Sequence, residues 1–121
     1  MDPVGALARI ITRPFRNRLS ADRLRRQIGS ATSLRIIVGA GGTAEEGWIP
    51  TEQSLVDLLQ PNTWSRFFDE HSVDAILAEH VWEHLTLANG RIAAETCFQF
   101  LKPGGYLRVA VPDGYHPSPD Y

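Results

Sequence analysis

The chain has 121 residues, enough for one domain with a modest core, and its formal net charge is −2. Its hydrophobic content of 43% is typical of a soluble domain, and no apolar run approaches the roughly 20 residues that a membrane-spanning helix needs. A single cysteine, Cys97, excludes an internal disulfide and a cysteine-based metal cluster, and it favours a reducing, cytoplasmic setting.

Residues 1–30 form an arginine-rich segment with a helical pattern. Seven arginines and two aspartates lie in residues 1–26, whereas the rest of the chain holds five basic and twelve acidic side chains. Apolar spacing predicts a short helix over residues 4–12, and Ser20 and Gly29 are placed to cap and to end a second helix. This basic start suits a solvated amphipathic helix, an arm that contacts nucleic-acid phosphates, or a transit peptide.

The second part of the chain, residues 31–121, contains four stretches that we interpret as strands. Three are compact apolar runs: LRIIV (34–38), SVDAILAE (72–79) and YLRVAVPD (106–113). The fourth, GWIPTE (47–52), contains a proline and can therefore only be a brief or edge strand.

Helical patterns separate these strands. The stretch SLVDLLQPNTWSRFFDE (54–70) predicts two helical turns divided at Pro61. The stretch NGRIAAETCFQFLKPGG (89–105) predicts a helix that ends in a Pro-Gly-Gly turn. Its expected buried face consists of Ile92, Ala93, Thr96, Cys97, Phe100 and Leu101. Alternating strands and helices predict an α/β fold with a parallel sheet of about four or five strands, in which ligands bind at the carboxyl ends of the strands.

A glycine loop follows the first predicted strand. Gly39, Gly41 and Gly42 would let the backbone approach a nucleotide-like ligand closely. The dinucleotide fingerprint fails, because Ala44 occupies the third glycine position and too few residues follow for a phosphate-binding helix. The loop therefore indicates a cofactor without a pyrophosphate. Glu52 ends the next strand, where it is either a ribose-binding carboxylate or a solvated surface acid.

His80, Glu83 and His84 form the pattern H-x-x-E-H, which one class of zinc metallopeptidase uses on a helix. Catalytic zinc usually needs three protein ligands, and no second ligand motif follows His84. The residues just before His80 also have a strand pattern. We therefore predict no metal site, keep a zinc hydrolase as a remote alternative, and interpret this stretch as a junction or a ligand contact. In a junction, the core side chains would be Val81, Trp82 and Leu85.

The order of the segments LRIIVGAGG, GWIPTE, SVDAILAEHVWEHL and LKPGGYLRVAVPD resembles the class I S-adenosylmethionine-dependent methyltransferases, in particular the type 11 group. The resemblance covers about residues 33–115. It implies a Rossmann-like sheet, S-adenosylmethionine as cofactor, and methyl transfer as the reaction. By resemblance, Gly39, Gly41 and Gly42 would line the methionine part of the cofactor and Glu52 would hold its ribose. Asp57 or Trp64 would lie against the adenine.

The same resemblance places the residues after the later strands beside the reacting methyl group. Glu79 would contact the cofactor or the acceptor, and His80 has the acid-base chemistry to take a proton from a hydroxyl or amine. Asp113 and His116, after the last strand, would lie on the substrate side. The acceptor, small molecule or macromolecule, is not predictable from these residues.

The full class I sheet has seven strands, so the resemblance also implies a chain that is truncated at the C-terminus. The last predicted strand would then have an apolar free edge, so we expect either a truncated reading frame or a half-domain that is completed as a homodimer through that edge. An alternative function follows: a non-catalytic methyltransferase-like domain that acts through self-association or partner binding. We expect no membrane partner.

Overall fold

The structure is a computed structural model, and it describes residues 18–113. A helix over residues 18–30 precedes an alternation of strands and helical segments. In chain order these are β1 (Arg35–Val38), β2 (Ile49–Pro50), α2 (Pro61–Trp64), β3 (Val73–Glu79), a 3₁₀ turn (Trp82–His84), α3 (Leu87–Phe100) and β4 (Leu101–Ala110). A strand is present at each of the four predicted places, and the proline-containing one is brief, as predicted. The bounds predicted for the last strand were wrong: β4 begins at Leu101, so the Pro-Gly-Gly stretch predicted as a turn lies within the strand, and residues 111–113 lie after its end.

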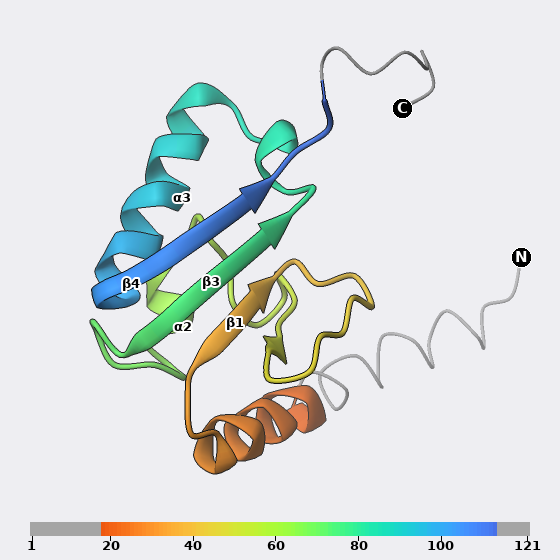
Figure 1. The fold of residues 1–121 in the computed structure, drawn as a ribbon, viewed down its shortest axis with the longest axis vertical. Coiled ribbons are helices and arrows are strands. Elements are labelled where there is room, and N and C mark those ends of the chain that lie inside the picture. Colours follow the sequence, from red (N-terminus) through yellow and green to blue (C-terminus); the bar gives the residue numbers. More distant parts are fainter. Residues whose placement is uncertain (1–17, 114–121) are drawn as a thin grey trace, which may run out of the picture.

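The strands form one parallel sheet with the order β2-β1-β3-β4. Helices α2 and α3 both lie behind the sheet in Figure 1, and the helix over residues 18–30 lies below β1. This is the predicted incomplete Rossmann-like α/β fold. Because all four strands run the same way, the loops that follow β1, β2 and β3 gather at one edge of the sheet.

The main core fills the space between the sheet and the helices behind it. The face of α3 that is buried consists of Ala93, Thr96, Cys97 and Phe100, as predicted, whereas Ile92 is 41% exposed. The indole of Trp64 stacks on Phe100 with ring centroids 5.3 Å apart. Burial raises the pKa of the Cys97 thiol to about 12, so the thiol stays neutral and behaves as a small apolar core group.

The helix over residues 18–30 belongs to this core, because Ala21 and Leu24 are buried in the main cluster. Ser20 is not its N-cap, since residues 18 and 19 are already helical, so that prediction was wrong. The helix continues through Ser30, one residue beyond the predicted end. The helix predicted over residues 4–12 lies outside the described residues. Among residues 18–113, no helix combines the length and the apolar character needed to cross a bilayer.

The stretch 54–70 differs from its prediction, because only Pro61–Trp64 is helical. The turns before it are held by Asp57. Its N–H donates to Thr63 Oγ1 (2.9 Å), its carboxylate accepts from the Leu59 N–H (2.9 Å), and its carbonyl accepts from the Trp64 indole N–H (3.0 Å). Hydrogen bonds from an aspartate to nearby backbone groups compete with helix formation, which explains why the apolar spacing was misleading.

Candidate functional site

The glycine loop after β1 has the backbone conformation that only glycine adopts at little cost. Gly39, Gly41 and Gly42 have φ values of 56°, 55° and 91°. A Cβ atom added at Gly39 would lie 3.2 Å from Val81 Cγ2, and one at Gly42 would project into open space. The glycines therefore form a thin, strongly curved loop at the carboxyl end of the central strand.

Two carboxylates lie on opposite sides of this loop. Glu52, two residues after β2, accepts a hydrogen bond from the Gly41 N–H at 3.0 Å and is otherwise exposed. Glu79 ends β3 on the other side, one residue after Ala78, which pairs with Val38. The structure thus brings the three predicted glycines together with Glu52 and Glu79 at one edge of the sheet.

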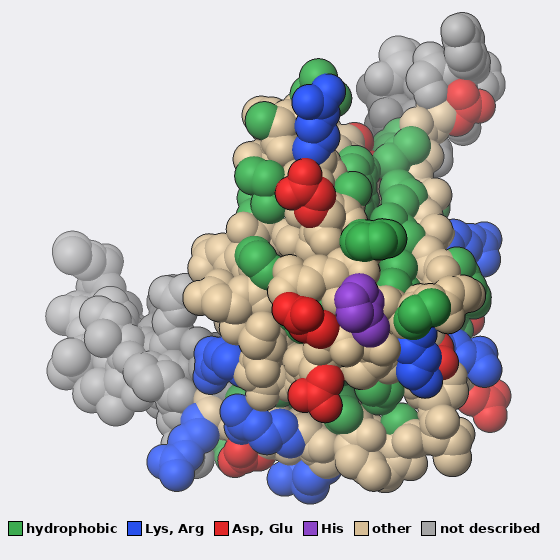
Figure 2. Space-filling model, turned by 90° about the vertical axis from the view of Figure 1, so that its left-hand side faces the viewer, with side chains coloured by type: hydrophobic (Ala, Val, Ile, Leu, Met, Phe, Trp, Pro, Cys, Tyr) green, Lys and Arg blue, Asp and Glu red, His purple; other side chains and the backbone are tan. Residues whose placement is uncertain are grey.

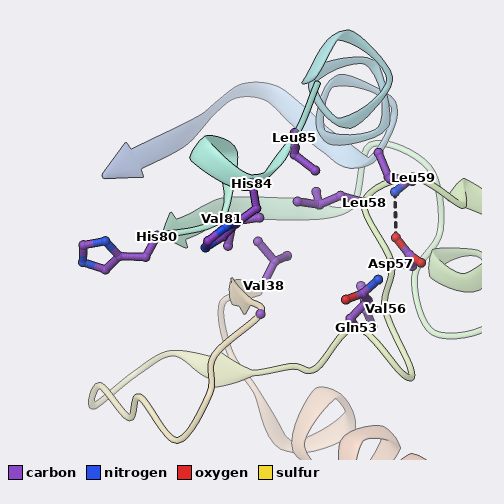
Figure 3. Close-up of a pocket in the computed structure, with 11 residues that line it drawn as sticks. Val38, Gln53, Val56, Asp57, Leu58, Leu59, His80, Val81, His84 and Leu85 are labelled. Atoms are coloured by element: carbon purple, nitrogen blue, oxygen red, sulfur yellow. Dashed lines mark hydrogen bonds between the residues drawn. The ribbon is translucent and has the colours of Figure 1, made fainter. Parts of the chain in front are cut away.

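An apolar pocket of about 230 Å³ opens next to the loop, at the carboxyl ends of β1 and β3 (Figure 3). In the close-up, the side chains of Val38, Leu58 and Leu85 converge around one hollow. The lining comes from three segments: the end of β1, the turns after β2, and the junction after β3. Its members are Val38, Gly39, Gln53, Val56, Asp57, Leu58, Leu59, His80, Val81, His84 and Leu85.

Asp57 and Trp64, the two candidates for contact with an adenine, differ in their positions. Asp57 lines the pocket, but one of its carboxylate oxygens holds the turn through the Leu59 N–H (Figure 3). Trp64 is fully buried in the core, and its interaction with a ligand is excluded in this fold, so that alternative was wrong. Helical spacing indicated that Trp64 packs against something, but not that it packs inside the protein.

The H-x-x-E-H stretch is a strand-to-turn junction, not a metal-binding helix. His80 has φ 54°, and its N–H donates to the Ala110 carbonyl at 2.8 Å. The 3₁₀ turn begins only at Trp82, so the two histidines do not share a helical face. Val81, Trp82 and Leu85 pack against the main core, as the junction interpretation predicted. Within residues 18–113, no group of three or more metal-ligating side chains comes together.

Glu83 lies between the two imidazoles. One of its carboxylate oxygens is 4.0 Å from His80 Nδ1 and 3.5 Å from His84 Nε2. Both histidines line the mouth of the pocket, but the His80 ring points away from the hollow in Figure 3. Asp113 is exposed and follows the end of β4, and His116 lies outside the described residues. The imidazole of His80 is therefore placed at the outer edge of the site.

Sequence reasoning missed the apolar part of the site. Val56, Leu58 and Leu59 lie shortly after Glu52, in the stretch 54–70 that we interpreted as helical. The available signal was their place in the chain: apolar residues in a connection that starts at the ligand-binding edge of a parallel sheet. Their spacing is also that of a helix packed on a core, so the periodicity did not indicate that they line a pocket.

Comparison with known proteins agrees with this geometry. The sequence model of the family described as "Methyltransferase domain" matches residues 42–109, more than half of the chain. No curated protein and no solved structure gave a match. The matched span runs from the glycine loop to the end of β4 and includes Glu52 and the whole junction after β3. The chain belongs to this methyltransferase family, and its parallel sheet is that of the class I S-adenosylmethionine-dependent methyltransferases.

Proposed function

We propose that this chain binds S-adenosylmethionine at the glycine loop and takes part in methyl transfer. One observation carries the proposal: a glycine loop, a carboxylate hydrogen-bonded to it, and an apolar pocket all meet at the carboxyl edge of the sheet. This combination matches the three parts of the cofactor, which are a flat base, a ribose diol and an amino-acid tail.

The residues present fit the cofactor in shape and charge. The apolar walls formed by Val38, Leu58 and Leu85 suit the adenine ring. Glu52 is exposed, so its carboxylate has lone pairs left to accept hydrogen bonds from two ribose hydroxyls. The open space beside Gly42, where an added Cβ atom would meet nothing within 4 Å, leaves room for the tail beside the loop. Glu79 supplies a second negative charge next to a ligand that carries a sulfonium and an ammonium group.

When bound, S-adenosylmethionine would supply a methyl group on its sulfonium sulfur, which an acceptor attacks in line at carbon while S-adenosylhomocysteine leaves. The protein's contribution is then mainly to orient the two reactants. Glu52 and the pocket would fix the nucleoside half, while the junction after β3 would border the acceptor. His80 stands at that border with Glu83 near its Nδ1 atom, so its Nε2 atom would be the one to receive a proton from a hydroxyl or amine acceptor.

The test uses S-adenosylhomocysteine, the demethylated product, in isothermal titration calorimetry with the 121-residue chain. We expect saturable binding at one site. Glu52→Gln keeps an oxygen that can accept from the Gly41 N–H but removes the charge, so cofactor binding should weaken by about 1.5–3 kcal/mol without loss of fold. The matched control is Glu46→Gln, an exposed glutamate in the same loop, which should bind like the wild type.

The result that would contradict the proposal is the absence of heat from a folded sample at high ligand concentration. Equal affinities of Glu52→Gln and the wild type would instead show that the ribose lies elsewhere. Binding without turnover against a panel of hydroxyl and amine acceptors would favour the non-catalytic alternative.

A further inference from the structure

Arginine side chains are concentrated on the helix over residues 18–30, in a protein that is otherwise acidic. Residues 1–26 hold seven arginines and two aspartates, against five basic and twelve acidic side chains in the rest of the chain. The helix presents four exposed arginines, and the turn after α2 adds a fifth. These five, which we call the arginine patch, are Arg18, Arg23, Arg25, Arg26 and Arg66. Figure 2 shows basic side chains gathered at the lower end of the molecule, where Figure 1 shows this helix.

The fold places Arg25 and Arg66 against the same aromatic ring, although they are far apart in the sequence. Their guanidinium carbons lie 5.1 Å and 5.8 Å from the centre of the Phe67 ring. Contact with the ring restricts both side chains, so less conformational entropy is lost when their N–H groups bind a ligand. Within residues 18–113, Arg66 makes no ion pair, although Asp69 and Glu70 follow it in the chain. Two neighbouring like charges repel each other, and an anionic ligand would relieve that repulsion.

The other arginines of the helix continue the patch around its exposed face. Successive residues of an α-helix are about 100° apart, so Arg18 and Arg26 lie between Arg25 on one side and Arg23 on the other. Asp22 is the one acidic residue of the helix, and it forms an exposed pair with Arg25 at 3.4 Å. The face therefore carries an excess of positive charge along its whole width.

Arg23 extends the patch toward the edge of the sheet that holds the glycine loop. Together with Ser20 and Gln27 it lines a recess of about 210 Å³ between the helix and the segment after β2, and Glu52 lies on the other wall. The guanidinium, hydroxyl and amide groups on the helix side can all donate hydrogen bonds to phosphate oxygens. An extended anion that follows the helix would thus pass from Phe67 to the neighbourhood of Glu52.

We propose that the arginine patch binds the phosphate backbone of a nucleic-acid strand. A guanidinium group pairs with phosphate oxygens through two parallel hydrogen bonds, and a row of arginines suits a row of phosphates. An anionic membrane fits less well, because a helix at a membrane surface buries its apolar face in the lipid. Here that face is used inside the protein, since Ala21 and Leu24 are 5% and 3% exposed and lie in the main core.

This surface is distinct from the pocket beside the glycine loop. Binding of a nucleic acid and binding of the cofactor can therefore fail or succeed independently of each other. If the proposed function also holds, a strand on the patch lies next to the cofactor edge through the recess at Arg23. Nucleic acids are then the class of methyl acceptor to test first, and that step rests on the proposed function.

The experiment is fluorescence anisotropy of a labelled RNA strand of about 12 nucleotides, and of a DNA strand with the same sequence, titrated with the 121-residue chain at several salt concentrations. Both strands should bind, because they share the phosphate groups. The logarithm of the association constant should fall linearly with the logarithm of the salt concentration, with a slope of about −2 to −4, which corresponds to about three to five phosphate contacts.

Variants that remove two charges from the patch should weaken this binding. Arg25→Gln with Arg66→Gln should lower the affinity about tenfold or more at low salt and should reduce the steepness of the slope by about 1.4. Arg18→Gln with Arg26→Gln should act in the same way and leaves the contacts with Phe67 in place. The matched control is Arg91→Gln with Arg108→Gln, the same loss of charge at exposed positions on α3 and β4, which should bind like the wild type.

Circular dichroism of each variant shows whether it is folded. A wild-type chain that leaves the anisotropy of both strands unchanged at low salt would overturn the proposal. Equal losses of affinity in the patch variants and in the control would also overturn it, because binding would then depend on net charge alone. Sedimentation of the chain with phosphatidylserine vesicles, without binding to either strand, would assign the patch to a membrane instead.

Discussion

At the scale of single residues, the geometry of Gly39 explains why glycine is required at the start of the loop. Its φ of 56° is unfavourable for any residue with a Cβ, and the nearest atom to that Cβ would be Val81 Cγ2 at 3.2 Å. Valine is stiff at χ1, so the methyl group cannot move aside without a change of rotamer. The conformation of one glycine thus couples the loop after β1 to the junction after β3.

We expect Gly39→Ala to lower the free energy of unfolding by about 1–2 kcal/mol from the backbone strain, with a further cost from the contact with Val81. Binding of S-adenosylhomocysteine should weaken as well, because the loop would have to shift. Urea unfolding and calorimetry measure the two effects. Gly29→Ala is the control: it lies in a helix with open space around it, and should be neutral or stabilising. Equal stabilities of the two variants would show that the Gly39 conformation is not a constraint.

At the scale of elements, Asp74 ties the beginnings of three strands together. Its carboxylate accepts from the Leu34 N–H at 2.8 Å, just before β1, and from Lys102 Nζ at 3.0 Å on β4. The hydrogen bond from the Leu34 N–H, together with Lys102, lowers the pKa of Asp74 below its ordinary value of 3.8. A carboxylate with a lowered pKa stabilises the fold above its unfolded-state pKa, and this stabilisation is lost as the pH falls through the folded-state pKa.

Asp74→Asn should therefore destabilise the protein near neutral pH by about 1–2 kcal/mol, a modest amount because the carboxylate is partly exposed. The difference in the free energy of unfolding between this variant and the wild type should shrink as the pH falls below about 4, because the Asp74 carboxyl group then takes up a proton, first in the unfolded state. Urea unfolding at several pH values measures it. Asp69→Asn, whose carboxylate is exposed, should show little difference at any pH. If Asp74→Asn lowered the free energy of unfolding by the same amount at every pH, the shape of the Asp74 side chain and not its charge would be what stabilises the fold.

The elements themselves could be predicted to different degrees. The compact apolar runs of β1 and β3 and the amphipathic pattern of α3 each fit one structure, so sequence was sufficient for them. The turns around Asp57 could not be predicted, because their polar hydrogen bonds compete with an apolar spacing that suits a helix. At the site, the position of Glu52 and of the glycines at the carboxyl edge could be predicted, because each of them comes directly after a predicted strand of a parallel sheet. The burial of Trp64 and the left-handed backbone of His80 depend on tertiary contacts that no local pattern records.

At the scale of the whole molecule, the arginine-rich helix over residues 18–30 and the methyltransferase sheet share one core. Leu24 is 3% exposed and lies in the same cluster as residues of β1, α2 and α3. The guanidinium carbon of Arg25 lies 5.1 Å from the centre of the Phe67 ring, so the helix also contacts the rest of the domain at the surface, next to the buried contact made by Leu24. The helix is thus a structural part of the domain.

This predicts that a cavity in the helix destabilises the whole domain. Leu24→Ala should lower the free energy of unfolding by about 2–4 kcal/mol, because it removes buried methyl groups from the shared core. The control is Leu19→Ala in the same helix, where the side chain is 52% exposed and the cost should stay within about 0.5 kcal/mol. Tryptophan fluorescence, to which Trp48, Trp64 and Trp82 all contribute and which therefore reports on the region outside the helix, and far-ultraviolet circular dichroism are followed in the same urea titration. They should give coincident transitions for both variants. If Leu24→Ala instead lost helix signal at low urea while the tryptophan fluorescence transition stayed at its wild-type midpoint, the helix would unfold independently of the sheet and the two would not share one core.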